Sequence, residues 1–399
     1  MSVTKLKTRP SFAEFVALIS LMMALTAVSI DAMLPALPQL GRDLQVQNAN
    51  DRQLVVSMIF LGLAVGQLFF GPLSDSFGRK PAIYIGLVLF MGGALLCMLA
   101  ISFPMLLAGR LLQGIGASAP RAVSLALVRD EFSGRAMARI MSFVMTVFIL
   151  TPMLAPSLGQ AILQFSGWRA IFGSYVLLAA FVLLWFALRQ PETLAPENRA
   201  PFTGRRIINT TQEIIKNRLA LGYTITAGFI SGAFIGYLNS AQQIFQEQYA
   251  LGTLFPIYFG VIASAIGLAS LLNSQLVTRL GMRFLVRNAL RIILVLSAAV
   301  LGIVTFLTGQ LHLWSLMAYL MLTFFFVGIL FGNLNALAME PLGHVAGIGA
   351  AVVGALSTLI SVLLGTYIGQ SYNGTILPLV MGLAVLSGLS LVVVHWAER

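Results

Sequence analysis

Twelve apolar runs, each long enough to cross a lipid bilayer, occupy most of this 399-residue sequence. A helix needs about 20 apolar residues to span the hydrocarbon core. Only 9% of the residues are charged, whereas soluble domains carry roughly 25%, so the charges are too few to coat a surface that faces water. We therefore predict an all-α integral membrane protein with twelve transmembrane helices, over residues 12–36, 53–72, 82–101, 104–128, 137–162, 168–189, 219–243, 254–276, 288–308, 313–336, 345–369 and 375–395.

The distribution of Lys and Arg predicts the side that each loop faces, because basic residues collect in cytoplasmic loops. If both termini are cytoplasmic, only Arg42, Arg52 and Arg169 fall on the opposite side, and Arg110 and Arg121 fall within a span. The other nineteen of the 24 basic residues are then cytoplasmic. We expect a multi-pass protein of the bacterial inner membrane. The net charge of +11 belongs to these loops and indicates no nucleic-acid binding, because no basic stretch is interleaved with aromatic residues.

A polar, proline-bearing segment divides the chain at its midpoint, with six spans on each side. We predict an N-terminal six-helix bundle over residues 1–190, a cytoplasmic linker over 191–218 and a C-terminal six-helix bundle over 219–399. The loop after the second span, 73–80, aligns with the loop 276–283 through a Leu, a Gly and a final basic residue. This match favours two pseudo-symmetric bundles, an arrangement of many secondary transporters.

Four stretches resemble motifs of the major facilitator superfamily. Residues 71–80, GPLSDSFGRK, resemble the signature loop between its second and third helices. Residues 109–117, GRLLQGIGA, and 151–159, TPMLAPSLG, resemble the fourth- and fifth-helix motifs of its drug/proton antiporters, although Ala155 and Gln160 replace usual glycines. Residues 31–38, DAMLPALP, resemble the acidic end of the first helix in the Bcr/CflA group of multidrug exporters.

This resemblance implies the major facilitator fold and a secondary active exporter that works by alternating access. Its expected substrates are small drug-like molecules, such as phenicol-type, cationic or lipophilic antibiotics, exchanged for protons. A proton-coupled transporter of one metabolite, such as a sugar or an amino acid, is the alternative, because one fold hosts many functions.

The charged residues inside the predicted spans are the first candidates for function, since each costs at least about 2.5 kcal/mol near the bilayer centre. Asp31 lies in the first span. A carboxyl group shielded from water holds its proton more tightly, so Asp31 can exchange protons near neutral pH and bind a cationic substrate in turn. A helix-end cap or a permanent ion pair is the alternative role for Asp31. Glu14, near the cytoplasmic end of the same span, is expected to reach the interface.

Arg110 and Arg121 lie eleven residues apart in the fourth span, which places them on one helix face. Arg110 keeps its charge, and it either holds a carboxylate and tunes its proton affinity or offers donors to the substrate. Gly114 and Ala117 lie between the two arginines, and we expect this face to line a cavity. The alternative for Arg121 is contact with lipid headgroups at the cytoplasmic surface.

Neutral polar side chains extend the set of expected substrate contacts, and they either line an exit path or are simply exposed to water. Phe and Met are numerous enough to line a promiscuous apolar pocket, although the sequence does not say which of them do so. The neutral candidates are Gln67, Tyr237, Asn239 and Gln242.

The signature loop and the fifth span contain the candidate gating residues. By resemblance, the loop forms a cytoplasmic latch between helices that breaks when the inner side opens; a solvated turn is the alternative. The prolines of the fifth span remove backbone donors and bend the helix, which favours a role in the conformational change. The candidates are Asp75, Gly78, Arg79, Arg129, Pro152 and Pro156.

The sequence contains no nucleotide-binding loop, metal-binding cluster or nucleophile pattern, so we do not expect an enzyme. We expect no cofactor and no metal, with the proton gradient as the energy source. The expected partners are small-molecule substrates, protons and the lipid bilayer, and the expected state is a monomer. The single cysteine, Cys97, forms no intramolecular disulfide and is expected to be a buried apolar residue.

The predicted topology can be tested by labelling single cysteines introduced at Thr203 and at Asn48. A membrane-impermeant thiol reagent added to intact cells should modify the cysteine at Asn48 and spare the one at Thr203, because the two loops are expected on opposite sides of the bilayer. Modification of both from outside the cell contradicts the topology.

Overall fold

The computed structural model describes residues 10–307 and 310–399. Lys5, Lys7, Arg9 and the end of the predicted span 288–308 lie outside the described residues. The described ranges contain helices, turns and loops but no strand. The long helices are α1 Phe12–Asp31, α3 Leu54–Phe77, α4 Arg79–Met98, α5 Phe103–Glu131, α6 Gly134–Ser166, α7 Trp168–Arg189, α9 Arg218–Gln242, α10 Phe255–Leu280, α11 Met282–Phe306, α12 Leu313–Met339, α13 Ala346–Gln370 and α14 Leu377–Ala397.

Eleven continuous helical stretches of the described chain are long and apolar enough to cross a membrane. One of them, Leu313–Gln370, is 58 residues long and contains both α12 and α13. A short helix at Glu340–Val345 joins the two, and Leu342 leaves helical geometry there (φ −107°, ψ 19°). Because α12 and α13 contain 27 and 25 residues, each is long enough to cross on its own. The predicted twelve crossings are therefore confirmed.

Several helix ends differ from the prediction by a few residues, and two of these differences have identifiable reasons. The first span was predicted to continue to residue 36, but α1 ends at Asp31 and a short 3₁₀ turn, Leu34–Ala36, follows it with Pro35 near its start. The ninth span was predicted to begin at residue 288, but α11 begins at Met282. Its first turns are basic, and ion pairs of Arg283 with Glu340 (3.3 Å) and of Arg287 with Glu398 (3.4 Å) accommodate them at the membrane edge.

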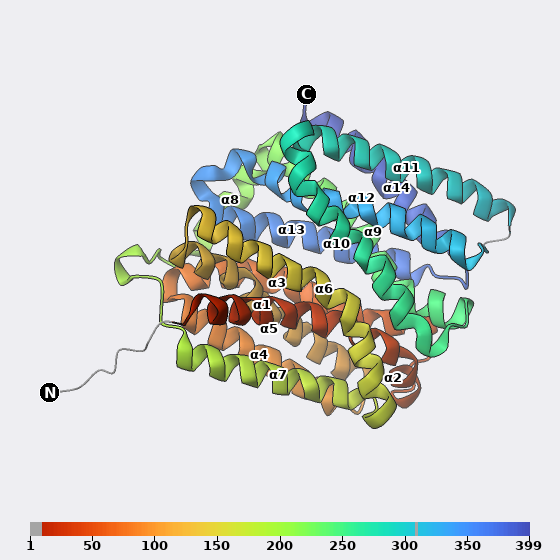
Figure 1. Cartoon of the computed structure of the whole chain (residues 1–399), viewed down its shortest axis with the longest axis horizontal. Helices are drawn as coiled ribbons and strands as arrows, with labels where there is room; N and C mark the ends of the chain where they lie inside the picture. Colours follow the sequence, from red (N-terminus) through yellow and green to blue (C-terminus); the bar gives the residue numbers. More distant parts are fainter. Residues whose placement is uncertain (1–9, 308–309) are drawn as a thin grey trace.

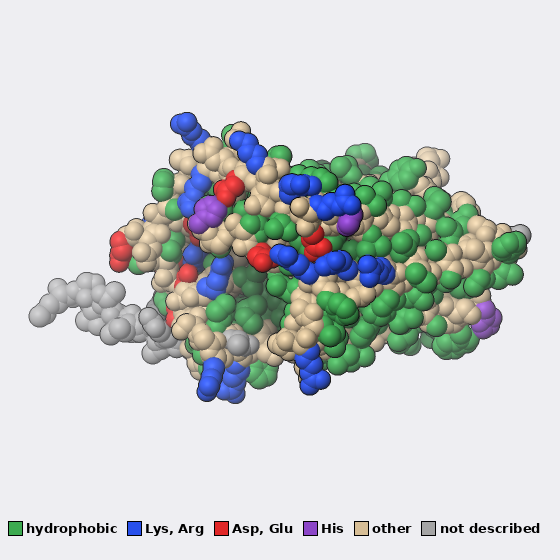
Figure 2. Space-filling view, turned by 90° about the horizontal axis from the view of Figure 1, so that it is seen from above, with side chains coloured by type: hydrophobic (Ala, Val, Ile, Leu, Met, Phe, Trp, Pro, Cys, Tyr) green, Lys and Arg blue, Asp and Glu red, His purple; other side chains and the backbone are tan. Residues whose placement is uncertain are grey.

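The long helices run side by side along the long axis of the molecule, with α1 to α7 in the lower part of Figure 1 and α9 to α14 above them. The linker helix α8 lies at the left, which we call the linker end, and the short helix α2, Leu37–Asp43, lies at the right, which we call the α2 end. Figure 2 shows charged side chains gathered toward the linker end of one face and a mainly hydrophobic surface beyond them. This pattern suits a protein embedded in lipid.

The linker contains a helix that the sequence analysis did not predict, α8, Gly204–Lys216. Its Ile214 is buried, and α8 packs against α9 and α13, while Arg205 and Arg206 on the same helix are exposed. The sequence shows this amphipathic pattern, but the apolar face is too short to resemble a membrane span.

The two loops that suggested an internal repeat share their backbone geometry. Gly78 follows α3 with φ +110° and ψ 162°, and Gly281 follows α10 with φ +78° and ψ 152°. A side chain is strained at such positive φ values, so a glycine is required at the same point of both halves. The match supports a repeat, and the division at residues 190 and 219 remains a proposal.

Glycines allow α3, α4 and α5 to pack in near-backbone contact. A Cβ atom on Gly114 of α5 would lie 2.1 Å from the carbonyl oxygen of Ile59 of α3, and one on Gly116 would lie 2.3 Å from the backbone nitrogen of Phe90 of α4. Lipid is as apolar as the helix surface, so close van der Waals contact drives helix association in membranes. These glycines therefore fix the positions of the helices that surround Arg110.

Substitution of Gly114 by alanine should destabilise the bundle, because the added methyl group cannot fit without moving α3. Overpacking of this kind costs about 1–3 kcal/mol, so the melting temperature of the purified protein in detergent should fall by several degrees. Gly302→Ala is the matched control, since this glycine lies in α11 and a Cβ there meets nothing within 4 Å. Equal melting temperatures for the two variants would show that the α3–α5 contact is not tight.

Candidate functional site

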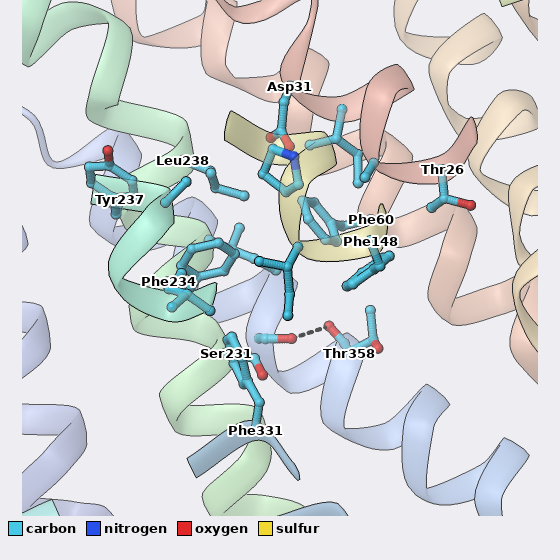
Figure 3. A pocket seen from close by; sticks show the side chains of 18 of the residues that line it. Thr26, Asp31, Phe60, Phe148, Ser231, Phe234, Tyr237, Leu238, Phe331 and Thr358 are labelled. Carbon is cyan, nitrogen blue, oxygen red and sulfur yellow. Dashed lines mark hydrogen bonds between the residues drawn. The ribbon is translucent and has the colours of Figure 1, made fainter. Parts of the chain in front are cut away.

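A cavity of about 380 Å³ lies between the two groups of helices. Residues of α1, α3, α5 and α6 form one side of its wall, and residues of α9, α10, α12 and α13 form the other. Most of the lining side chains are apolar, and Figure 3 shows several aromatic rings converging on the same space. Its size and lining suit a small, partly aromatic molecule. The aromatic residues are Phe60, Phe148, Phe234, Tyr237, Phe259 and Phe331.

Asp31 lies at one end of this cavity, as the last residue of α1, and its side chain points toward the aromatic group (Figure 3). It is only 5% exposed, and the neighbouring Tyr237 is 2% exposed. Among the described residues, no hydrogen bond or ion pair involves the Asp31 carboxyl group. The geometry therefore gives no support to a permanent ion pair and leaves the carboxyl group available to the cavity.

Arg110 lies outside the cavity wall and is fully buried. Its guanidinium donates to the carbonyl oxygens of Val55 (2.9 Å) and Ser29 (2.9 Å) and to Oε1 of Gln113 (2.7 Å). These bonds join α1, α3 and α5, and none of them reaches a carboxylate. Arg110 is thus placed to hold three helices of the first half together, not to contact a molecule in the cavity of this conformation.

The predicted cavity face of α5 must be corrected accordingly. Gly114 packs against the backbone of α3, and Ala117 is buried with its carbonyl oxygen accepting a hydrogen bond from Thr26 of α1 (3.3 Å). The face from Arg110 to Ala117 is therefore covered by helices of its own half. Only Arg121, one turn further on, reaches the cavity.

Arg121 and Gln67 line the cavity closer to the linker end. The Arg121 side chain is exposed to the open space, and no hydrogen bond or ion pair of it occurs among the described residues. Of the described residues that line the cavity, Asp31 is the only acid and Arg121 the only base. The site thus contains two opposite charges that do not neutralise each other directly.

The cavity opens toward the linker end. Along the face of α10 that meets α6, Gly260 lies against Met153 and Gly267 against Ile149. Ser274 continues this face two turns later and is exposed, as is Ser142 at the corresponding place on α6. The two helices therefore separate toward the linker end, while the opposite end of the cavity, around Asp31, is closed.

A set of hydrogen bonds between the halves closes the α2 end, and we call it the α2-end seal. Arg52 pairs with Glu247 (2.8 Å), and Asn50 donates to the carbonyl oxygens of Gln370 (3.0 Å) and Tyr372 (2.8 Å). Most of these bonds connect neutral groups, so each contributes only about 1 kcal/mol. The remaining members of the seal are Gln53, Ser57, Asn239, Gln243 and Thr366.

Asn239 and Gln242 belong to this closed region and not to the cavity wall. Asn239 is 1% exposed and donates to Oγ of Ser57 and to the carbonyl oxygen of Gly365, both at 3.1 Å. Gln242 is also 1% exposed and donates to Gln246 of its own segment (3.1 Å). In this conformation both side chains are buried, so neither lines an exit or faces water.

The signature loop forms a latch at the linker end. Arg79 binds Asp75 (2.5 Å) and Asp130 (2.9 Å), and it also donates to Oγ of Ser74 (2.9 Å). These contacts tie the end of α3 to the start of α4 and the end of α5. Asp75 also lies beside Gly347 in the first turn of α13, where a Cβ would be 3.5 Å from its Oδ2 atom. A carboxylate is favoured at a helix N-terminus, so the latch extends to the other half.

The latch includes two residues that were not among the main sequence candidates. Asp130 accepts from Arg79, whereas Arg129, which was the named candidate, is exposed and donates only to Leu125 of its own helix. Glu192, after α7, accepts from the backbone nitrogens of Arg79 (2.8 Å) and Lys80 (3.0 Å) and so caps α4. Asp130 can be recognised as the partner of Arg79 only when the position of α4 beside α5 is known. No sequence motif pointed to Glu192.

Pro152 lines the cavity, and Pro156 is buried one turn further along α6. Both lack the backbone donor of a regular helix. The turn after them packs closely on the end of α1, since a Cβ on Gly159 would lie 1.8 Å from the carbonyl oxygen of Ala32. This part of α6 therefore closes the cavity beside Asp31, and the role of the two prolines in the conformational change stays a prediction.

Comparison with known proteins places these features in a family. Residues 19–366 match the model of the Major Facilitator Superfamily. The chain is 33% identical over 358 residues to an uncharacterized MFS-type transporter of Bacillus subtilis, covering 88% of this chain and 87% of the relative. It is 30% identical to a bicyclomycin resistance protein homolog of Haemophilus influenzae, covering 92% and 91%, and 27% identical to multidrug resistance protein D of Escherichia coli, covering 93% and 94%.

A solved structure shares the fold over nearly the whole chain. The D-xylose–proton symporter superposes with a TM-score of 0.75 at 13% identity, covering 98% of both chains. Of these relatives, which the chain matches over most of its length, one is named a transporter and two are named for drug resistance. The chain belongs to the Major Facilitator Superfamily.

Proposed function

We propose that this protein expels small drug-like molecules in exchange for protons by alternating access. The observation that carries the proposal is the placement of Asp31, the only acid among the described residues of an aromatic cavity, at the closed end of that cavity. Such a carboxyl group can bind a proton or the cationic group of a substrate, but not both at once. Competition for one carboxylate is sufficient to couple the two movements.

The exchange follows from the cost of an unpaired charge in a place with little water. With the cavity open to the cytoplasm, a cationic drug displaces the proton of Asp31, and the loaded cavity closes. With the cavity open to the outside, where protons are more abundant, a proton displaces the drug. The carboxylate is neutralised in both closed states, whereas an empty, ionised Asp31 resists closure.

The names of the relatives support export of drugs in place of uptake of nutrients. The Haemophilus relative is named for bicyclomycin resistance and the Escherichia relative for multidrug resistance. We propose cationic or lipophilic antibiotics, phenicol-type compounds included, as the substrate class. The energy source is the proton gradient, and the working unit is a monomer.

The alternative, transport of one sugar or amino acid, fits the cavity less well. A sugar needs several hydrogen-bonding side chains around its hydroxyl groups, whereas most of the wall is apolar or aromatic. Measuring growth with and without the gene separates the two functions. We expect the loss of the gene to sensitise cells to several unrelated drugs, and a defect restricted to one nutrient would favour the alternative.

The proposed orientation follows the distribution of basic residues. The linker end, which includes α8 and the latch, is assigned to the cytoplasm of a bacterium, and the α2 end faces outward across the inner membrane. The conformation described above is then inward-facing, with its outer side closed by the α2-end seal.

The latch should control the rate of transport more than the binding of substrate, because its residues do not line the cavity. We expect Asp75→Asn and Arg79→Ala to insert normally, to bind drug with an affinity close to that of the parent, and to transport it several-fold more slowly. Arg283→Ala, which breaks an exposed ion pair at the related loop of the other half, is the control. This role would be contradicted if the latch variants lost their affinity for the drug while drug-loaded vesicles showed the same transport rate as the parent.

Asp31→Asn should abolish proton-driven efflux, because an amide mimics the protonated carboxyl group permanently. The measurement is drug movement in everted membrane vesicles with an imposed pH gradient, compared with the parent. Glu14→Gln is the matched control on the same helix, since Glu14 is already held by Arg189 (2.5 Å) and Trp185 (3.1 Å) and does not line the cavity. Gradient-driven efflux that persists in Asp31→Asn would exclude Asp31 as the proton carrier.

A further inference from the structure

We infer that Arg121 is a specificity-determining residue that binds an acidic group of the substrate, so that the preferred substrates are elongated aromatic zwitterions. The inference rests on the proposed function, since it adds a second charged contact to the cavity of Asp31. Its starting point is that Arg121 lines the cavity with an exposed side chain and with no hydrogen bond or ion pair among the described residues.

Arg121 differs in this respect from Arg110, the other arginine within the predicted span of α5, which does not line the cavity. The Nε and Nη1 atoms of Arg110 donate to two backbone carbonyls and a glutamine within its own half, and only its Nη2 atom lacks a partner among the described residues. Arg121 has no such partners, although the helix could have presented an apolar residue at this position at lower cost. Its planar set of donors matches a carboxylate in a bidentate manner, which a neutral polar residue cannot do.

The charge balance of the closed cavity favours a zwitterion over a simple cation. A cation neutralises Asp31 but leaves Arg121 unpaired when the cavity closes and water is excluded. A simple anion neutralises Arg121 and leaves Asp31 to a proton, so it does not compete for that proton. A molecule with a basic group and an acidic group pairs both residues at once and still displaces the proton. Closure then buries no uncompensated charge.

The distance between the two residues limits the shape of such a molecule. Thr26 of α1 bonds to the carbonyl oxygen of Ala117 of α5, which places these two residues at one level of the membrane. Asp31 lies five residues beyond Thr26 toward the α2 end, and Arg121 lies four residues beyond Ala117 toward the linker end. At 1.5 Å per residue their backbones are about 13 Å apart along the helices. In an amino acid the ammonium and carboxylate groups are attached to the same carbon atom. Such a molecule does not span this distance, even when the long side chain of Arg121 reaches into the cavity.

The space between the two charges is lined by flat apolar groups. Phe60 and Phe148 lie on one side and Phe234 on the other, all in contact with the same cavity (Figure 3). An aromatic scaffold that has its amine at one end and its carboxylate at the other fits this sequence of acid, rings and base. The amine is oriented toward the closed end and the carboxylate toward the opening.

The test compares three fluorescent compounds with one scaffold: norfloxacin, which is a zwitterion with its charges at opposite ends, its methyl ester, which is a cation, and its N-acetyl derivative, which is an anion. Efflux of each is measured in proteoliposomes with an imposed pH gradient. We expect the parent to move norfloxacin at least roughly tenfold faster than either derivative, as the loss of a charge-assisted contact implies. Arg121→Gln should move norfloxacin no faster than the ester, and Arg121→Lys should restore part of the preference.

Arg206→Gln, which removes an exposed arginine of the linker helix, is the control for the loss of one positive charge. Equal efflux of norfloxacin and its ester by the parent, or a zwitterion preference that survives in Arg121→Gln, would overturn the inference. In either case the proposed function still stands if the pH gradient drives efflux of the ester and Asp31→Asn abolishes that efflux. If none of the three compounds moves in response to the gradient, both proposals fail for this scaffold and the zwitterion class is rejected.

Discussion

The cost of leaving a charge unpaired in the membrane determines how this protein is organised. Three ionisable groups of the predicted spans lie deep in the first half, and their environments are of two kinds. Arg110 is buried inside the bundle and donates to carbonyl oxygens of α1 and α3. Asp31 and Arg121 face a shared cavity without direct partners among the described residues. The first residue stabilises the fold, and the other two have interactions to offer to a substrate or a proton.

The two ends of the molecule are closed by different kinds of contact, and the difference suits a transporter. The α2-end seal consists mainly of hydrogen bonds between neutral side chains and backbone carbonyls, together with the ion pair of Arg52 and Glu247. Water can replace such bonds at small net cost. The latch at the linker end instead concentrates charge around Arg79. It is intact here although α6 and α10 have separated, so the opening on this side is partial.

The sequence predicted the fold well because membrane helices depend on composition and length, which are local properties. All twelve crossings were found, and α7 was placed at its observed ends. The helix α8 was missed because its apolar face is short. Site residues were harder to predict. Asp31, Gln67, Arg121 and Tyr237 line the cavity.

The sequence could not separate Arg110 from Arg121, which share a helix face in projection. What separates them is the tight packing of Gly114 on α3, a contact between residues far apart in the chain. The same limit applies to Asn239, which the pattern placed either on an exit path or on a face exposed to water and which in the structure bonds to Ser57 of the other half. Which aromatic residues form the pocket also depended on the arrangement of eight helices.

The central claim is that the substrate and the proton compete for one carboxyl group, and proton release on binding tests it most directly. A drug with a cationic group is added to the purified protein in weakly buffered detergent solution near neutral pH, and a pH indicator reports the protons released. The account predicts that the parent releases about one proton for each molecule bound and that Asp31→Asn binds without release. Equal proton release by the parent and by Asp31→Asn would contradict it.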